Sequence, residues 1–209
     1  MSDFFSPDSK VMQYGNKLAD FILISIYTIV CSLPIITIGA SLTAMHYSVY
    51  KIYCNEESTV TKDFFKGFKT NFKKATVLWI FLLMLGSLII GDYWLLSDNN
   101  LNVHRLFTVI LLVITVYMIL ILQWIFVLLS RYENTVLKTL CNATVIAIAN
   151  LGKTLLILIL SVVPFVLSYM LTWLLPLIVA LGISGCAYVK VFIYDKVFRK
   201  LEEPENVGN

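Results

Sequence analysis

Residues 155–173 form the stretch LLILILSVVPFVLSYMLTW, in which no side chain carries a charge. A helix that crosses the roughly 30 Å hydrocarbon core of a bilayer needs about 20 apolar residues, and this stretch has that length. The apolar run continues to Val191, which is too far for a single span, so the chain must turn back within it. We expect the turn near Tyr169–Pro176, between a span over residues 154–171 and a span over residues 174–191.

Pro164 lies in the middle of the first of these two spans. A proline inside a membrane helix is tolerated where neighbouring groups satisfy the carbonyl that loses its amide partner. We therefore interpret Pro164 as a kink within one helix and not as the end of that helix.

The composition of the whole chain agrees with a membrane protein. Apolar residues make up 59% of the 209 residues and charged residues only 14%, compared with about 45–50% and 25% in soluble domains. So few charges cannot cover the surface of a soluble protein of this size. The net charge of +3 is small, and we expect no nucleic-acid partner.

Further apolar stretches lie upstream and predict the rest of an all-α helical bundle with about six spans. Residues 75–96 and 106–130 each have the length of one span. Residues 18–53 are too long for one span and contain Pro34 and Gly39, which favour a reversal. We divide this stretch into spans over residues 18–33 and 40–53, with a re-entrant hairpin as the alternative for the second. The predicted domain is residues 1–200, followed by a short polar tail over residues 201–209.

The distribution of positive charge predicts the orientation. Lysine and arginine collect on the cytoplasmic side of membrane proteins. With six spans and both termini in the cytoplasm, every one of the 16 basic residues except Arg105 falls on that side. Five spans would move Lys10 and Lys17 outside, whereas a re-entrant hairpin over residues 40–53 would leave the charge count unchanged.

Two segments on the predicted cytoplasmic side read as amphipathic helices, over residues 61–74 and 134–151. In the first, phenylalanines recur at helical spacing and lysines occupy the other faces. This pattern is typical of a helix in the membrane interface in contact with lipids, and equally of a helix that packs its aromatic face on the bundle. The candidate interface or partner residues in and beside these segments are Phe64, Phe65, Phe68, Asn71, Phe72, Lys73, Arg131, Asn134 and Asn142.

The sequence contains no recognisable set of catalytic residues. No Ser-His-Asp grouping, HExxH, phosphate-binding loop or dinucleotide fingerprint is present. The sequence also lacks a CxxC pair, the motif typical of zinc and redox sites. We expect no enzymatic activity, no cofactor and no metal. His46 is the only titratable side chain well inside a predicted span, and Gln123 is a polar side chain near the middle of its span; such groups are candidates for function. A structural role is favoured for the lone His46, and Gln123 is expected to bond across helices.

Small residues follow the predicted turn and leave one face of the next helix with little bulk. Small faces allow helices to approach closely, so packing within the chain is favoured over an interface with a partner. The candidate turn and packing motif consists of Pro34, Thr37, Gly39, Ser41 and Ala44.

The stretch Ser32–Ser41, SLPIITIGAS, resembles the "slPvvTiGaS" signature of the YesL-like family of bacterial membrane proteins, a family of unknown function. Further matching positions follow in order: Phe64, Phe65, Phe68, Asn71–Ala75, Trp79, Arg131, Tyr132, Asn134, Asn142 and Ala143. The resemblance implies a multi-pass protein of the bacterial cell membrane. Genes of this family typically lie beside components of carbohydrate ABC transporters, which implies an accessory role in glycan uptake.

Three functions fit these observations. The leading expectation is a non-catalytic accessory or assembly subunit that contacts the permease subunits of a carbohydrate ABC transporter. The first alternative is a small independent transporter or channel with a polar path along Thr37, Ser41, His46 and Gln123, and the second is a membrane sensor. A polar cavity inside the bundle would favour the transporter, and a flat groove of small residues facing lipid would favour the subunit.

Overall fold

The computed structural model describes residues 10–56, 59–97, 105–171, 173 and 175–202, and within these ranges the fold is helical. The predicted all-α class is confirmed. In chain order the elements are α1 (Lys10–Ser32), the short 3₁₀ turn η2 (Ile35–Thr37), α2 (Ile38–Tyr53), α3 (Val60–Ser97), α4 (Arg105–Arg131), α5 (Val136–Ala149), α6 (Leu151–Met170) and α7 (Leu175–Glu202).

Four of the described helices are long and apolar enough to cross a membrane, over Tyr14–Ser32, Val60–Trp94, Phe107–Arg131 and Leu151–Met170. These helices make the chain a multi-pass membrane protein. α2 has 16 residues, or about 24 Å of helix, which is shorter than the hydrocarbon core and agrees with the re-entrant alternative for residues 40–53. α7 carries the predicted span over residues 174–191, although position 174 and the side chains of residues 175–180 lie outside the described part.

The helix boundaries differ from the predicted ones at two places. The amphipathic segment over residues 61–74 and the span over residues 75–96 are one helix, α3, of 38 residues. The junction is continuous because Lys73, Lys74 and Ala75 are good helix formers and no proline interrupts them. α7 continues to Glu202, so the predicted tail begins inside a helix, and residues 203–209 lie outside the described part.

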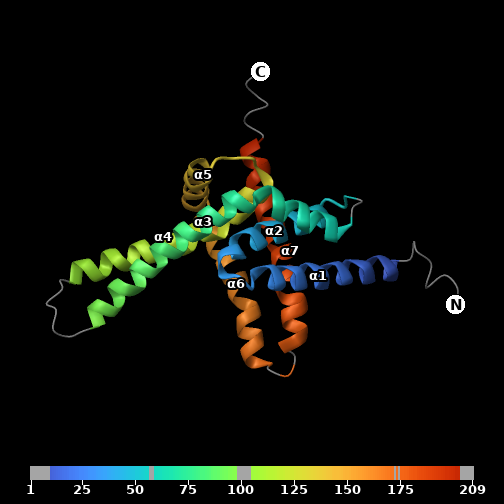
Figure 1. Cartoon of the computed structure of the whole chain (residues 1–209), viewed down its shortest axis with the longest axis horizontal. Coiled ribbons are helices and arrows are strands. Elements are labelled where there is room, and N and C mark those ends of the chain that lie inside the picture. Colours follow the sequence, from blue (N-terminus) through green and yellow to red (C-terminus); the bar gives the residue numbers. More distant parts are fainter. Residues whose placement is uncertain (1–9, 57–58, 98–104, 172, 174, 203–209) are drawn as a thin grey trace, which may run out of the picture.

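α2 lies at the centre of the molecule, in contact with α1, α3, α4 and α7. α3 and α4 form one long hairpin, and α6 and α7 form another. Figure 1 shows that the two hairpins extend in different directions from the region of α2, while α5 lies near the end of α7 that leads to the C-terminus. The outer parts of the hairpins are therefore separated, and the helices converge around α2.

The buried core follows this convergence. Trp124, Phe64 and Phe198 are the largest side chains that are fully enclosed. The hairpins, in contrast, expose large apolar side chains along their length, among them Met84, Val113, Ile159 and Phe165. Apolar exposure on this scale fits a surface that faces lipid and not water.

The turn between α1 and α2 explains why the packing motif has its composition. Thr37 Oγ1 donates to the carbonyl of Cys31 at 2.6 Å, which satisfies a free acceptor at the end of α1. A Cβ on Gly39 would lie only 2.7 Å from the carbonyl oxygen of Ala75 and 2.7 Å from Cβ of Trp79. Trp79 Nε1 also donates to the carbonyl of Ile35 at 2.7 Å. The motif thus fastens the turn to α3 within the chain.

Candidate functional site: a cavity among four helices

A cavity of about 450 Å³ lies among α2, α4, α6 and α7. Most of its lining is apolar, as is usual in ligand sites of 300–1,000 Å³ that carry a few placed polar groups. No Asp or Glu is among the described residues that line it. Its lining side chains with polar or sulfur atoms are Met45, His46, Gln123, Ser161, Ser168, Cys186, Lys190 and Tyr194.

Three of these residues form a chain of hydrogen bonds across three helices. Lys190 Nζ on α7 donates to Ser161 Oγ on α6 at 2.7 Å. Ser161 Oγ lies 2.9 Å from Gln123 Oε1 on α4 and 2.8 Å from the carbonyl oxygen of Ile157, in donor geometry toward both. The predicted cross-helix bond of Gln123 is confirmed. The serine hydroxyl thereby holds both the amide and the ammonium at the wall of the cavity.

The structure adds a contact of Lys190 that the sequence did not predict, since the charge pattern counted this residue only among the cytoplasmic charges. Its side chain is half-buried and lies beside the intramembrane residue Gln123 through Ser161. A lysine near the end of a predicted span is interpreted as an interface residue, because the sequence does not show which way the helix face that carries it points. The missed signal was its spacing from Cys186 and Tyr194, which places all three on one face of α7.

His46 lies on the α2 side of the same cavity. Its Nδ1 atom is buried and has no hydrogen-bond partner among the described residues. The ring stands edge-on to Tyr194, with 6.0 Å between ring centroids, and Tyr194 donates its hydroxyl proton to the carbonyl of Gln123 at 3.1 Å. A buried polar atom without a partner is rare in folded proteins, which makes Nδ1 a candidate hydrogen-bonding atom at this wall.

The carbonyl that Pro164 leaves without an amide partner is satisfied next to this cavity, as expected, and α6 continues through the proline. Pro164 removes the amide that would bond to the carbonyl of Leu160 within α6. The thiol of Cys186 on α7 donates to that carbonyl instead, at 2.8 Å. Pro164 and Cys186 both line the cavity. The proline and the hydrogen bond that compensates for its missing amide therefore lie at the cavity wall.

The expected polar path is only partly assembled. His46 and Gln123 line the cavity, but Thr37 and Ser41 do not. Ser41 is fully buried, with its hydroxyl donating to the carbonyl of Thr37 at 3.1 Å. Pro34 belongs to the same turn, and Gly39 and Ala44 are buried inside the chain. These positions therefore support the bundle around the cavity. The polar groups that line the cavity beside His46 and Gln123 include Lys190 and Ser161 instead of Thr37 and Ser41.

The candidate interface residues of α3 divide between core and surface. Phe64 is fully buried and lies beside Tyr27 of α1, with 5.6 Å between ring centroids. Phe65 and Phe72 are exposed, Phe68 is partly buried, and Lys73 is exposed. The amide of Asn71 donates to the carbonyl of Gly67 at 3.2 Å within the same helix. The packing alternative thus holds for Phe64 and Phe68, and the lipid-interface alternative stays a prediction for Phe65, Phe72 and Lys73.

A second polar cluster lies at the C-terminal end of α4, beyond the cavity residue Gln123 along that helix. Asp195 is 3% exposed and accepts from Arg131 Nη1 at 3.2 Å and from Arg199 Nε at 2.6 Å. The bond to Asp195 raises the pKa of Arg199. The pKa of Tyr132 is also raised, mainly by burial and to a smaller extent by the bond to Glu202. The guanidinium of Arg131 also lies over the rings of Tyr50 and Phe198. This cluster ties α4 to α7.

The asparagines predicted in this region take no part in the cluster. The backbone amide of Asn134 donates to the carbonyl of Tyr132 at 2.9 Å in the turn before α5. Asn142 is exposed on α5. Among the described residues, no three His, Cys, Asp or Glu side chains gather as a candidate metal site.

Comparison with known proteins gives one match. No curated protein matches the chain, and no solved structure matches it. A family model described as "Protein of unknown function, DUF624" matches residues 21–93. The matched region comprises most of α1, the turn η2, α2 and α3 as far as position 93, and therefore includes the Pro34–Ser41 turn and the His46 wall of the cavity.

Proposed function

We propose that this protein is a small membrane transporter that binds a hydroxyl-bearing organic anion in the cavity among α2, α4, α6 and α7. The observation that carries the proposal is Lys190, an ammonium held 2.7 Å from Ser161 in a cavity with no described carboxylate. An ionisable group inside a membrane protein is costly and usually marks a substrate or ion path. An anionic ligand would neutralise it.

The other cavity groups define the rest of the ligand. Ser161, Gln123 and the free Nδ1 of His46 are hydrogen-bonding groups on three different helices. Such groups suit several hydroxyls on one small molecule, because each buried polar atom of the ligand needs a partner. The apolar remainder of the wall excludes water, which strengthens a charge-assisted bond to Lys190.

A pair of matched probes tests the proposal. Gluconate and sorbitol have the same carbon chain and differ at one end, where gluconate carries a carboxylate. With the full chain in phosphatidylcholine nanodiscs, we expect calorimetry to detect gluconate and to give sorbitol at least about tenfold weaker binding, the usual contribution of a charged hydrogen bond. Equal binding of both probes, or of neither, would contradict the anion specificity.

Variants at Lys190 connect the binding to the site. Lys190→Met keeps the length of the side chain and removes its charge, and should lower gluconate affinity by about tenfold or more. Lys200→Met is the matched control, because Lys200 is exposed on the same helix and lies outside the cavity. Uptake of labelled gluconate into proteoliposomes then separates transport from binding alone.

The accessory-subunit role in a carbohydrate ABC transporter is the second candidate, and the outer face of α5 favours it. α5 is held to the bundle by Thr139, Ala143, Ile146 and Ala147, whereas Leu137 and Val145 are 74% and 64% exposed. An exposed apolar face of this kind fits a permease or ATPase surface. This role rests on the resemblance to the YesL-like family, and the bacterial cell membrane is the location it implies.

The test of this second role is purification from native membranes in mild detergent, with mass spectrometry of the proteins that accompany the chain. Stoichiometric permease subunits, lost in a Leu137→Ser and Val145→Ser double variant, would support it. Recovery of the chain alone would count against the subunit role and favour the transporter. Leucine at Gly39 cannot serve as a probe of partner contact, because a Cβ at this position already meets α3.

A further inference from the structure

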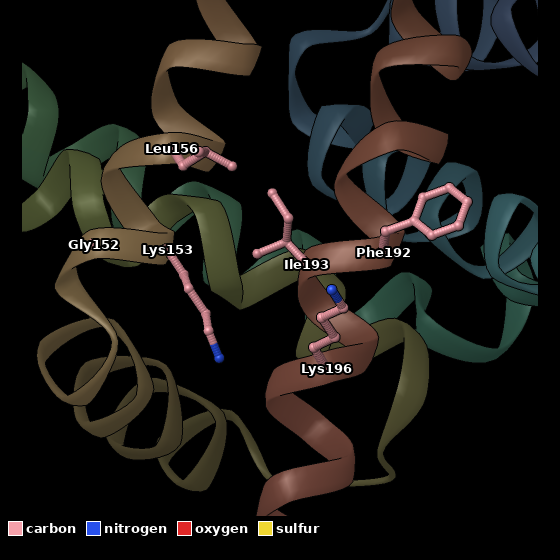
Figure 2. A pocket seen from close by; sticks show the side chains of 6 residues that line it. All are labelled: Gly152, Lys153, Leu156, Phe192, Ile193 and Lys196. Atoms are coloured by element: carbon pink, nitrogen blue, oxygen red, sulfur yellow. The ribbon is translucent and has the colours of Figure 1, made fainter.

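A second recess lies between α6 and α7, near the ends of these helices that adjoin α5 and the C-terminus. Its volume is about 240 Å³, and it is lined by Gly152, Lys153, Leu156, Phe192, Ile193 and Lys196. Figure 2 shows Lys153 extending from α6 and Lys196 from α7, while Leu156 and Ile193 point toward each other across the gap. The recess thus combines two ammonium groups with an apolar interior.

Neither lysine has an ion-pair partner among the described residues. Each of the described ion pairs involves Lys51, Arg131 or Arg199 as the cation. Lys196 is exposed and Lys153 is half-buried, and both belong to the group of charges that the sequence places on the cytoplasmic side. Their charge is therefore available to an anionic group that enters the recess.

The apolar part of the recess continues along α6 away from the lysines. Leu156, Ile159, Val163 and Val166 follow one another at spacings of three and four residues, which places them on one face. Their exposed fractions are 49%, 66%, 41% and 51%. A second apolar hollow of about 420 Å³ lies along Ile159, Val163 and Val166. The face from Leu156 to Val166 spans about 15 Å of helix, enough for a substantial part of an acyl chain.

We propose that this recess binds one anionic phospholipid, with its phosphate between Lys153 and Lys196 and an acyl chain along the Leu156–Val166 face of α6. The charge selects an anionic headgroup, and the apolar track selects a lipid over a soluble anion. Basic pockets between membrane helices on the cytoplasmic side are suited to such headgroups. Gly152 adds space at the headgroup, since a Cβ there would meet nothing within 4 Å.

Native mass spectrometry of the full chain tests the proposal. The protein is reconstituted in nanodiscs of equal parts phosphatidylglycerol and phosphatidylcholine and then released into mild detergent. We expect one phosphatidylglycerol to remain bound to the wild type. A Lys153→Gln and Lys196→Gln double variant should retain it about 30-fold more weakly, because each lysine near an anionic lipid contributes about fivefold.

The control is Lys138→Gln with Lys200→Gln, which removes the same charge from exposed positions at the same end of the molecule. Retention of phosphatidylglycerol by this control, with loss in the first variant, would support the recess. Equal loss in both variants would show a general surface-charge effect and overturn the proposal, as would full retention in the first variant.

Gly152→Leu provides a second variant that keeps both charges and fills the recess. It should also displace the bound lipid, while the thermal unfolding midpoint in lipid-free detergent stays that of the wild type. Unchanged lipid retention in Gly152→Leu would place the lipid elsewhere. None of these readouts depends on the gluconate site, because Lys153 and Lys196 do not line the cavity that contains Lys190.

Discussion

Asp195 on α7 and Arg131 at the end of α4 form an ion pair of 3.2 Å, in which the carboxylate side chain is 4% exposed and the guanidinium side chain 15%. Tyr53 of α2 donates to the same carboxylate at 3.3 Å. Through Asp195, these bonds therefore join α2, α4 and α7. Removal of one partner of a buried pair leaves the other charge uncompensated.

We predict that Asp195→Asn lowers the free energy of unfolding by about 3 kcal/mol, the usual cost of breaking a buried ion pair. Glu202→Gln is the matched control on the same helix. Glu202 contacts Arg131 at 3.5 Å but is 47% exposed, so its loss should cost less than about 1 kcal/mol. Thermal unfolding of both variants in detergent measures the difference, and equal destabilisation would contradict the assigned role of Asp195.

The close contact between α2 and α3 at Gly39 predicts that one added methyl group lowers the stability of the protein. Gly39→Ala should destabilise the protein by about 1–3 kcal/mol, as overpacking of a close contact does, because the new Cβ would meet the backbone of Ala75 and the side chain of Trp79. Gly86→Ala on α3 is the control, since its Cβ has open space. That change should be neutral or stabilise by up to about 1 kcal/mol. Chemical denaturation of the two variants gives the comparison.

We predict that substitutions at Pro164 and Cys186 are energetically coupled, because both residues act on the carbonyl of Leu160. Cys186→Ala should cost about 0.6 kcal/mol, the mean value of hydrogen bonds between membrane helices, because the carbonyl of Leu160 loses its donor. In a Pro164→Ala background, the restored amide of residue 164 satisfies that carbonyl, and the cost should disappear. A double-mutant cycle measures this coupling, and additive effects would show that the thiol does not serve the kink.

Lys190 predicts opposite effects on stability and binding. Lys190→Met should raise the free energy of unfolding, on the order of 1 kcal/mol, since it removes a charge that no described carboxylate compensates. The same change should remove gluconate binding. A variant that is both less stable and unable to bind would show that Lys190 holds the bundle together and is not kept for a ligand.

Much of the fold could be predicted because membrane insertion depends on local composition. The long apolar runs around residues 75–96, 106–130 and 155–173 were each enough to indicate a helix. The turn at Pro34 and Gly39 followed from backbone chemistry at two positions, and the cross-helix role of Gln123 followed from the cost of an unpaired amide in an apolar bundle. Thr37 and Ser41 belong to the turn and packing motif, as predicted; the alternative polar path did not allow for a polar side chain in a span bonding to backbone as readily as lining a path.

The sequence by itself therefore determined that this chain is a helical membrane protein, where its main turns fall and which amide must find a partner on another helix. Only the tertiary structure decided that Lys190, Ser161 and His46 face one cavity and that Asp195 meets Arg131. The physical reason is that hydropathy is a sum over neighbouring residues, whereas the face a helix presents depends on its rotation against distant helices. Ser25 and Ser184, bonded at 2.9 Å although 159 residues apart, fix such a rotation between α1 and α7, and no local pattern in the sequence encodes that contact.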